Sequence, residues 1–303
     1  MKGTTDFMTR KKGKDLFFIA LIYAAAFVGG WFGSAFAQGE LLRFFLFDLF
    51  ATLITFFFSV LLKNSSVYDA YWSLTPLYMA ILLFLRAGAF RPFHLLFLAA
   101  FALWSVRLTA NWCAVFTDFS YEDWRYAKFR AENPPVLWFF INLFGIHLVP
   151  TLVVFGGMLP LFALAKADAD ARVLPGVILL LCGVALEFFA DRQMHAHLAA
   201  DQTHSVCRRG LWRYSRHPNY LGEITVWVGV FLAMLPIVPE KWYYGVGALS
   251  VALLFCFVSV PLMEKRQLAR RPRYAQYKKD TSCLLLLPPK GKDESSEPVG
   301  TAE

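Results

Sequence analysis

The 303-residue chain is 57% hydrophobic, contains 31 Phe and 9 Trp, and has charge on only 17% of its residues. Soluble domains are about 45–50% apolar and about 25% charged, so this composition excludes an ordinary soluble enzyme and predicts a multispanning membrane protein. The net charge of +8 comes mainly from residues between apolar runs, where the positive-inside rule and anionic lipid headgroups account for it, so no nucleic-acid partner is expected.

Apolar runs of about 20 residues predict an all-α transmembrane bundle of about eight helices, with a range of seven to nine. The runs are 16–36, 41–62, 73–90, 93–116, 136–165, 173–190, 224–239 and 243–263. The fifth run is too long for an upright span, so Pro150 and Pro160 are expected to kink or end it. The first run precedes an Ala35-Phe36-Ala37 segment that resembles a signal-peptidase site, but its length favours a retained helix over the alternative of a cleaved signal.

Lys and Arg residues are distributed asymmetrically between the predicted loops. With the N-terminus inside, 23 of the 30 fall on the inner side, mostly in segments 1–15, 191–223 and 264–303. This bias predicts that both chain termini are cytoplasmic. A site facing the cytoplasm, without disulfide signals, is compatible with a bacterial inner membrane.

Cysteine and histidine spacing gives no sign of a metal centre. The five cysteines are far apart in the chain and form no CxxC pair, so neither a disulfide framework nor a zinc site is predicted. His195 and His197 are two positions apart, which points them to different helix faces, and His204 completes no HExxH pattern. All three are expected to lie at the surface or among lipid headgroups. We expect no metal.

The densest polar cluster next to an apolar run is the segment 210–223, Gly-Leu-Trp-Arg-Tyr-Ser-Arg-His-Pro-Asn-Tyr-Leu-Gly-Glu. Arg213 and Arg216 are three residues apart, and guanidinium groups bind phosphate oxygens in a bidentate way. Asn219 and Glu223 are four residues apart and could present an amide and a carboxylate on one helix face. Polar groups at membrane depth are costly, so the segment is predicted to bind an anionic cofactor.

This segment resembles the signature of the steroid 5α-reductase superfamily, and more closely its largely uncharacterised bacterial branch. Further matching positions are Asp69-x-x-Trp72, Arg107, Glu122-Asp123-Trp124-Arg125-Tyr126, Glu187-x-x-x-Asp191 and Glu264-x-Arg266 followed by Tyr274 and Tyr277. The resemblance implies an NADPH-dependent reductase that acts on an activated carbon–carbon double bond in a lipid. It divides the chain into N-terminal helices (1–62), a reductase-like domain (63–289) with a substrate half (63–165) and a cofactor half (173–289), and a disordered tail (290–303).

The same resemblance assigns roles to individual residues. Asp69, Arg107 and Glu223 are the catalytic candidates, with Asp69 as the acid near the substrate. Asp191 is expected on the ribose or adenine side of the cofactor, with Arg213 as a candidate ion-pair partner. The residues expected to bind the cofactor are Arg125, Glu187, Asp191, Arg213, Tyr214, Arg216, His217, Asn219, Tyr220, Glu223, Glu264, Arg266, Tyr274 and Tyr277.

A second family remains as an alternative. Arg-His-Pro-x-Tyr-x-Gly followed by a Glu-bearing helix also resembles the isoprenylcysteine carboxyl methyltransferases, which bind S-adenosylmethionine. The Asn219 and Gly222-Glu223 positions look more like the reductases, and the several arginines suit a phosphorylated ligand better than a sulfonium compound. A non-enzymatic membrane protein is the third interpretation.

One departure from the reductase pattern concerns the substrate. Reductases of the steroid branch polarise the substrate carbonyl with a Glu–Tyr pair in the N-terminal helices. Here Trp104 stands three positions before Arg107, and an indole does not readily lose a proton. A 3-oxo-steroid is therefore not the expected substrate. Asp48, inside the second apolar run, is a further intramembrane acid that needs a partner.

Overall fold

A computed structural model describes residues 2–200 and 205–290, and every regular element among them is helical. The predicted tail 290–303 lies outside the described residues except for Lys290, as does His204. The α-helices are α1 (Lys2–Ser34), α2 (Glu40–Leu61), α3 (Tyr71–Ala87), α4 (Pro92–Val115), α5 (Trp124–Glu132), α6 (Pro135–Phe140), α7 (Val149–Leu164), α8 (Leu174–Ala200), α9 (Pro218–Met234), α10 (Val246–Leu254), α11 (Val260–Arg270) and α12 (Tyr274–Asp280). Short 3₁₀ turns lie at Ser65–Tyr68, Ala171–Val173, Gly210–Arg213 and Pro239–Gly245, and π-helical segments at Ile141–Leu148 and Phe255–Ser259.

Seven helical stretches of the described residues are long and apolar enough to cross a membrane, which agrees with the predicted range of seven to nine spans. The remaining predicted run, the seventh (224–239), corresponds to α9, which has 17 residues and measures about 26 Å at 1.5 Å per residue. This helix starts six residues before the predicted start at 224, because Pro218 is pre-organised for the first helical position. Asn219 and Tyr220 therefore belong to its first turn.

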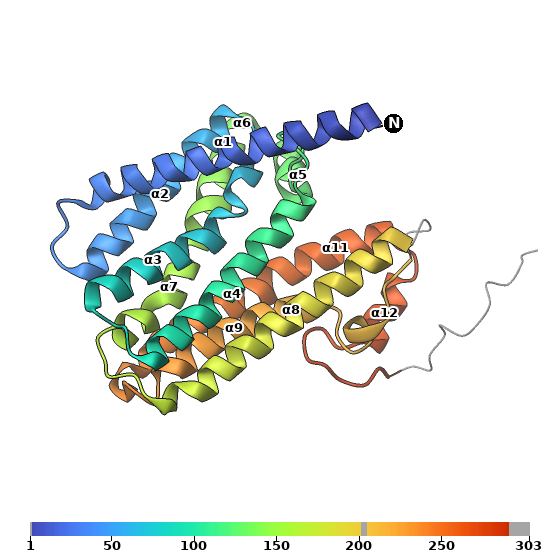
Figure 1. The fold of residues 1–303 in the computed structure, drawn as a ribbon. Coiled ribbons are helices and arrows are strands. Elements are labelled where there is room, and N and C mark those ends of the chain that lie inside the picture. Colours follow the sequence, from blue (N-terminus) through green and yellow to red (C-terminus); the bar gives the residue numbers. More distant parts are fainter. Residues whose placement is uncertain (1, 201–204, 291–303) are drawn as a thin grey trace, which may run out of the picture.

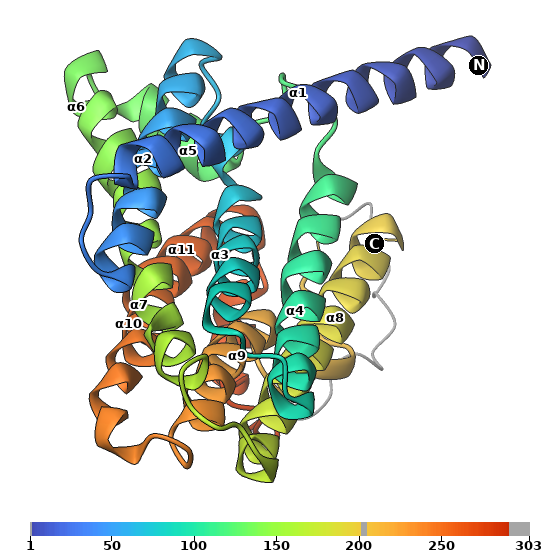
Figure 2. The ribbon, with the colours of Figure 1, turned by 60° about the vertical axis from the view of Figure 1, so that its left-hand side comes forward.

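The long helices run side by side, and the segments that connect them lie at the two ends of the bundle (Figures 1 and 2). One of these, which we call the inner end after the side predicted from charge, contains the segment 116–134, the C-terminal part of α8, the turn 205–217 and α12. The outer end contains the connections 88–91, 165–173 and 235–245. Figure 2 shows α1 crossing the other helices obliquely at the inner end. The core between α4, α8 and α9 is built around the fully buried rings of Trp104 and Trp227.

The fifth predicted run does not end at Pro150 or Pro160, which were expected to kink or end it. Pro150 is the second residue of α7 and Pro160 lies inside it, so the stretch from Pro135 to Leu164 is continuous. A π-helical segment precedes Pro150, and a second one precedes Pro261 at the start of α11. Proline lacks an N–H and its ring collides with the carbonyl four residues earlier, and the wider π turn relieves this clash.

Helices α8 and α9 approach each other closely because glycine lines their contact. A Cβ atom at Gly176 would lie 2.0 Å from the backbone nitrogen of Ala233, and one at Gly183 would lie 2.7 Å from the carbonyl oxygen of Gly222. These neighbours are backbone atoms, which cannot move aside as a side chain can. Small residues at such contacts are typical of helix pairs in membranes.

We expect Gly176→Ala to destabilise the protein by about 1–3 kcal/mol or more, because the new methyl group would overlap the backbone of α9. Unfolding by SDS in mixed micelles would measure the loss. Gly145→Ala is the matched control, since the nearest side-chain atom to its Cβ would lie 4.0 Å away. Equal stability of the two variants would show that α8 and α9 are not in close contact.

Candidate functional site

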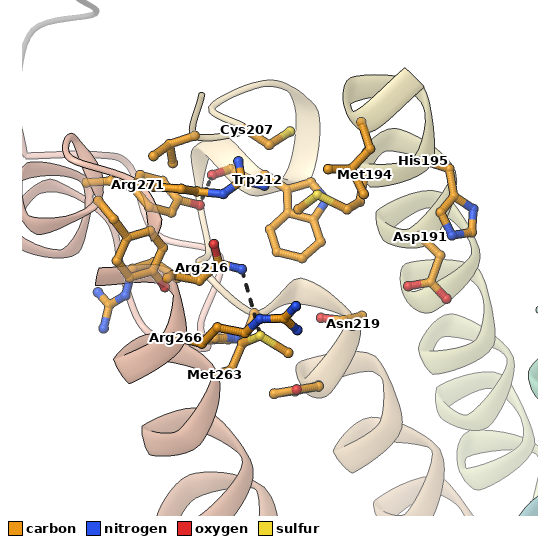
Figure 3. A pocket seen from close by; sticks show the side chains of 17 residues that line it. Asp191, Met194, His195, Cys207, Trp212, Arg216, Asn219, Met263, Arg266 and Arg271 are labelled. Carbon is orange, nitrogen blue, oxygen red and sulfur yellow. Dashed lines mark hydrogen bonds between the residues drawn. The ribbon is translucent and has the colours of Figure 1, made fainter. Parts of the chain in front are cut away.

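The cavity at the inner end, with a volume of about 250 Å³, lies between α8, the start of α9, α11 and α12 (Figure 3). Eight of the predicted cofactor residues line it: Asp191, Arg216, His217, Asn219, Tyr220, Arg266, Tyr274 and Tyr277. Figure 3 shows Arg216, Asn219 and Arg266 close together, with Asp191 and His195 coming from α8 on the other side. The sequence segments predicted to share a site are therefore adjacent in the fold.

The turn that carries the signature is bound tightly to α8. Gly210 has a φ of +57°, and a Cβ there would lie 2.4 Å from the side chain of Gln193, so both conformation and space favour glycine. The Gln193 amide oxygen accepts a hydrogen bond from the Leu211 backbone N–H at 2.8 Å. The Trp212 indole donates to the carbonyl of Ala190 at 2.9 Å. These bonds fix the direction in which the chain enters α9.

Arg216 is held by protein groups on several sides and is only 8% exposed. Its Nε donates to Glu264 at 2.7 Å, and one terminal nitrogen donates to the carbonyls of Lys278, at 2.9 Å, and Thr281. The Lys278 ammonium lies 2.6 Å from the other Glu264 oxygen. Arg216 thus joins α9, α11 and α12, and Glu264 neutralises much of its charge.

His217 stacks on Tyr220, with ring centroids 5.2 Å apart and planes 7° from parallel. Its Nε2 atom is buried without a hydrogen-bond partner among the described residues, 3.5 Å from Glu264. The side chains of His217, Glu264 and Cys283 lie close enough together to be considered as ligands of a metal ion. Two cations already contact the carboxylate, however, and they would repel a metal ion, so the group is better described as an ion-pair cluster.

The opposite wall of the cavity contributes two further arginines. The Arg266 guanidinium lies over the Trp124 ring at 4.1 Å. Arg271 also lines the cavity, and within the described residues neither arginine forms an ion pair. Tyr277 closes the far side by donating to the carbonyl of Ser215 at 3.2 Å, and burial raises the pKa of its phenol. Arg266 and Arg271 are therefore the cations best placed to meet an anion.

Asp191 leads from the cavity to a buried ion-pair cluster between α4 and α8. Arg107 donates to Glu187 at 2.6 Å and to Asp191 at 3.0 Å. The Arg107 side chain is 10% exposed and that of Glu187 only 3%. The structure thus pairs Asp191 with Arg107, whereas the sequence offers Arg213 as the candidate partner. Arg213 is exposed on the 3₁₀ turn and does not line the cavity.

Glu223 lies deeper in the bundle than Asn219, although both lie on α9. Its two carboxylate oxygens accept hydrogen bonds from the indoles of Trp104, at 3.0 Å, and Trp227, at 2.8 Å. Only 3% of Glu223 is exposed, and it does not line the cavity. The expected shared presentation of Asn219 and Glu223 to one ligand is therefore not seen.

The remaining predicted residues form separate local contacts. Asp69 accepts a hydrogen bond from the Tyr126 hydroxyl at 2.8 Å, and Arg125 donates to Asp123 at 2.8 Å. Tyr214 is 40% exposed and lies outside the cavity. Of the three catalytic candidates, Asp69 has Tyr126 as its partner, whereas Arg107 and Glu223 belong to one buried cluster because Glu187 interacts with both.

Sequence reasoning missed several residues of the site. Trp212 and Arg271 line the cavity. His195 lines it too and is exposed, as expected from the spacing of the histidines. Arg271 belongs to a run of basic residues at the end of α11, a signal that could have drawn attention to it. The intramembrane Asp48 has Tyr71 as its partner, whose hydroxyl donates to its carboxylate at 2.9 Å. This acid–phenol pair joins α2 to α3.

Comparison with known proteins places the chain in a family. Residues 55–281 match the model of a family described as a protein of unknown function (DUF1295). An uncharacterized protein of Schizosaccharomyces pombe is 26% identical over 205 residues, a match that covers 57% of this chain and 58% of the yeast protein. No solved structure matches. Because the matched region extends from α2 to the end of α12 and includes the whole cavity, the chain belongs to the DUF1295 family.

Proposed function

We propose that this protein is an integral-membrane, NADPH-dependent reductase of an activated carbon–carbon double bond in a lipid. The observation that carries the proposal is the cavity at the inner end, in which Arg266 and Arg271 have no carboxylate partner in the described part of the chain, while Asn219 and Asp191 lie on the other walls. Guanidinium groups of this kind suit phosphate oxygens, and an amide and a carboxylate suit carboxamide and hydroxyl groups. The motif resemblance to the steroid 5α-reductase superfamily points the same way.

The side chains that line the cavity suit the chemical groups of NADPH, but the cavity is small for a dinucleotide. Trp212, Tyr220 and Tyr274 supply flat surfaces for a base or nicotinamide ring. About 250 Å³ is below the roughly 300–1,000 Å³ of typical ligand sites. Side chains such as Met263 must therefore move for a dinucleotide to enter, and methionine is flexible enough to do so.

When bound, NADPH would supply hydride to the β-carbon of the substrate. The protein has to hold the substrate and stabilise charge on its carbonyl oxygen. The Asp48–Tyr71 pair is the best candidate for that task, because a phenol hydrogen-bonded to a carboxylate can reorient its hydroxyl towards an oxyanion. This pair would have the role for which the indole of Trp104 is chemically unsuited. Tyr71 is only 1% exposed, so substrate binding would have to separate the helices around it.

A methyltransferase is the second candidate, and two observations favour it. S-adenosylmethionine is smaller than NADPH and would fit the cavity volume more closely. Arg216, the arginine most prominent in the motif, is already neutralised by Glu264. Against this, Arg266 and Arg271 would have no phosphate to bind.

We expect NADPH to raise the melting temperature of the detergent-solubilised protein more than S-adenosylmethionine does. We also expect the double substitution Arg266→Ala/Arg271→Ala to weaken NADPH binding by about 100-fold or more, since each charged hydrogen bond contributes about 1.5–3 kcal/mol. Titration by fluorescence or calorimetry would measure the affinity. Arg172→Ala, at the outer end, is the control and should bind normally.

The alternatives give different results in the same experiment. If only S-adenosylmethionine raises the melting temperature, the result would support a methyltransferase and contradict the reductase proposal. A protein that responds to neither compound would contradict both enzyme proposals, which is the result that a non-enzymatic membrane protein predicts.

A further inference from the structure

We propose that the loop 282–289, here called the leucine loop, inserts into the lipid leaflet at the inner end of the bundle and holds the Arg216 turn in place from the lipid side. The loop follows α12 and contains four consecutive leucines, 284–287. Leu285 is 60% exposed, Leu286 41% and Leu287 51%. Three neighbouring large apolar side chains with this exposure are unfavourable in water and need a covering phase.

The leucine loop is closed and attached to the body of the protein. The Leu287 backbone N–H donates to the carbonyl of Tyr214 at 3.2 Å, and the Lys290 N–H donates to the carbonyl of Asp280 at 2.8 Å. Figure 1 shows that the chain forms a wide loop directly after α12. The leucines are therefore presented in a defined position.

The loop is attached to the sides of α8 and α11, below the inner ends of these two helices. The turn that it contacts is itself fixed to α8, because Trp212 bonds to the carbonyl of Ala190. Ala190 lies ten residues before the end of α8, which is about 15 Å along the helix axis. Arg216 pairs with Glu264, six residues or about 9 Å before the end of α11. The Arg216 N–H donates to the carbonyl of Ser282 at 2.9 Å, which places the start of the loop at this level.

Lipid is the partner that best matches this position. Phe188 and Phe189, within one turn of Ala190 on α8, are 45% and 53% exposed, as expected for residues of a membrane span that face lipid. The turn to which the leucine loop is attached is fixed to α8 at Ala190, one or two residues from these phenylalanines. Lys279 and Lys290, which lie near the two ends of the loop, suit anionic headgroups at the interface.

Because of these contacts, lipid around the leucine loop would act on the cavity through Arg216; we call this link the mechanical connection. Arg216 lines the cavity, and both its backbone N–H and its guanidinium group bond to the segment that ends in the leucine loop. Lipid contact with the loop would hold this wall of the cavity closed. The inference does not depend on which ligand the cavity binds.

Lipid labelling would test the position of the loop directly. The protein would be reconstituted into phosphatidylcholine–phosphatidylglycerol vesicles that contain a lipid with a diazirine in its acyl chain, and labelled peptides would be mapped by mass spectrometry. We expect label on residues 284–287. Leu198, which is 51% exposed but lies eight residues beyond Ala190 towards the end of α8, is the internal control and should carry none. A leucine loop without label, whether it lies in water or under a second copy of the chain, would overturn the proposal.

A variant tests the connection to Arg216. In the triple substitution Leu285→Ser/Leu286→Ser/Leu287→Ser, we expect hydrogen exchange of the Arg216 amide in vesicles to rise about tenfold or more, because the loop that covers it opens more often. Leu249→Ser removes a lipid-facing leucine of α10 that is 56% exposed and should leave this amide unchanged. Equal exchange in the two variants would contradict the mechanical connection.

Discussion

Replacing Arg107 with methionine is expected to lower the free energy of unfolding by about 3–5 kcal/mol, one of the largest effects of any single substitution in this chain. The guanidinium group bonds to Glu187 and Asp191 between α4 and α8. Glu187 is 3% exposed and would be left as a buried carboxylate without a cation. Unfolding by SDS in mixed micelles, followed by tryptophan fluorescence, would measure the loss.

The double substitution Arg107→Met/Glu187→Met separates charge burial from packing. If the single variant is unstable because of the orphaned carboxylate, the double variant should recover most of the stability, since apolar residues of similar volume often replace buried ion pairs without cost. Arg172→Met, which removes the exposed pair with Asp170, should change stability by less than about 0.5 kcal/mol. A loss below about 1 kcal/mol for Arg107→Met would show that the cluster is open to water.

Arg216→Ala is expected to release the C-terminal segment from the bundle and to cost about 3–5 kcal/mol. The substitution removes bonds to Glu264 and to two carbonyls of the α12 region, and it leaves Glu264 buried with Lys278 as its nearby cation. Limited trypsin digestion, followed by mass spectrometry, should show faster cleavage after Lys278 and Lys279. The expected primary effect is therefore structural, with any loss of ligand binding as a consequence.

Two further variants sharpen this test. Arg216→Lys should also be destabilised, since one ammonium group on a flexible chain cannot reproduce the planar, multiple bonding of guanidinium. Arg209→Ala changes an exposed arginine of the same segment and serves as the control. If Arg216→Ala is digested at the wild-type rate but no longer binds nucleotide, Arg216 acts on the ligand and not on the fold.

The predicted membrane architecture depended on signals that are local in the sequence. Apolar runs of about 20 residues specify spans because each must satisfy its own backbone hydrogen bonds in lipid, and seven such stretches are present among the described residues. The apolar runs alone did not predict where each helix begins and ends. The start of α9 at Pro218 and the continuous passage through Pro150 depend on how proline is accommodated by neighbouring turns.

The spacing of residues in the sequence could not predict which side chains form ion pairs or hydrogen bonds with each other. The sequence offered Arg213 as the partner of Asp191, whereas the packing of α4 against α8 selects Arg107. Arg216 has the composition of a phosphate ligand, yet the three acceptors that surround it come from α11 and from the α12 region. The acid–phenol pair of Asp48 and Tyr71 was missed for the same reason.

The sequence by itself determined the membrane class, the range of span numbers and the segment around which the inner end is built, because hydrophobic length and a dense polar motif are local properties. Only the tertiary structure decided which charges neutralise each other and which remain open to a ligand. Ion pairing depends on distances between residues that are far apart in the chain, such as Arg107 and Glu187 or Arg216 and Glu264. Those distances are set by close helix contacts such as that of Gly176 with α9, which no single segment specifies.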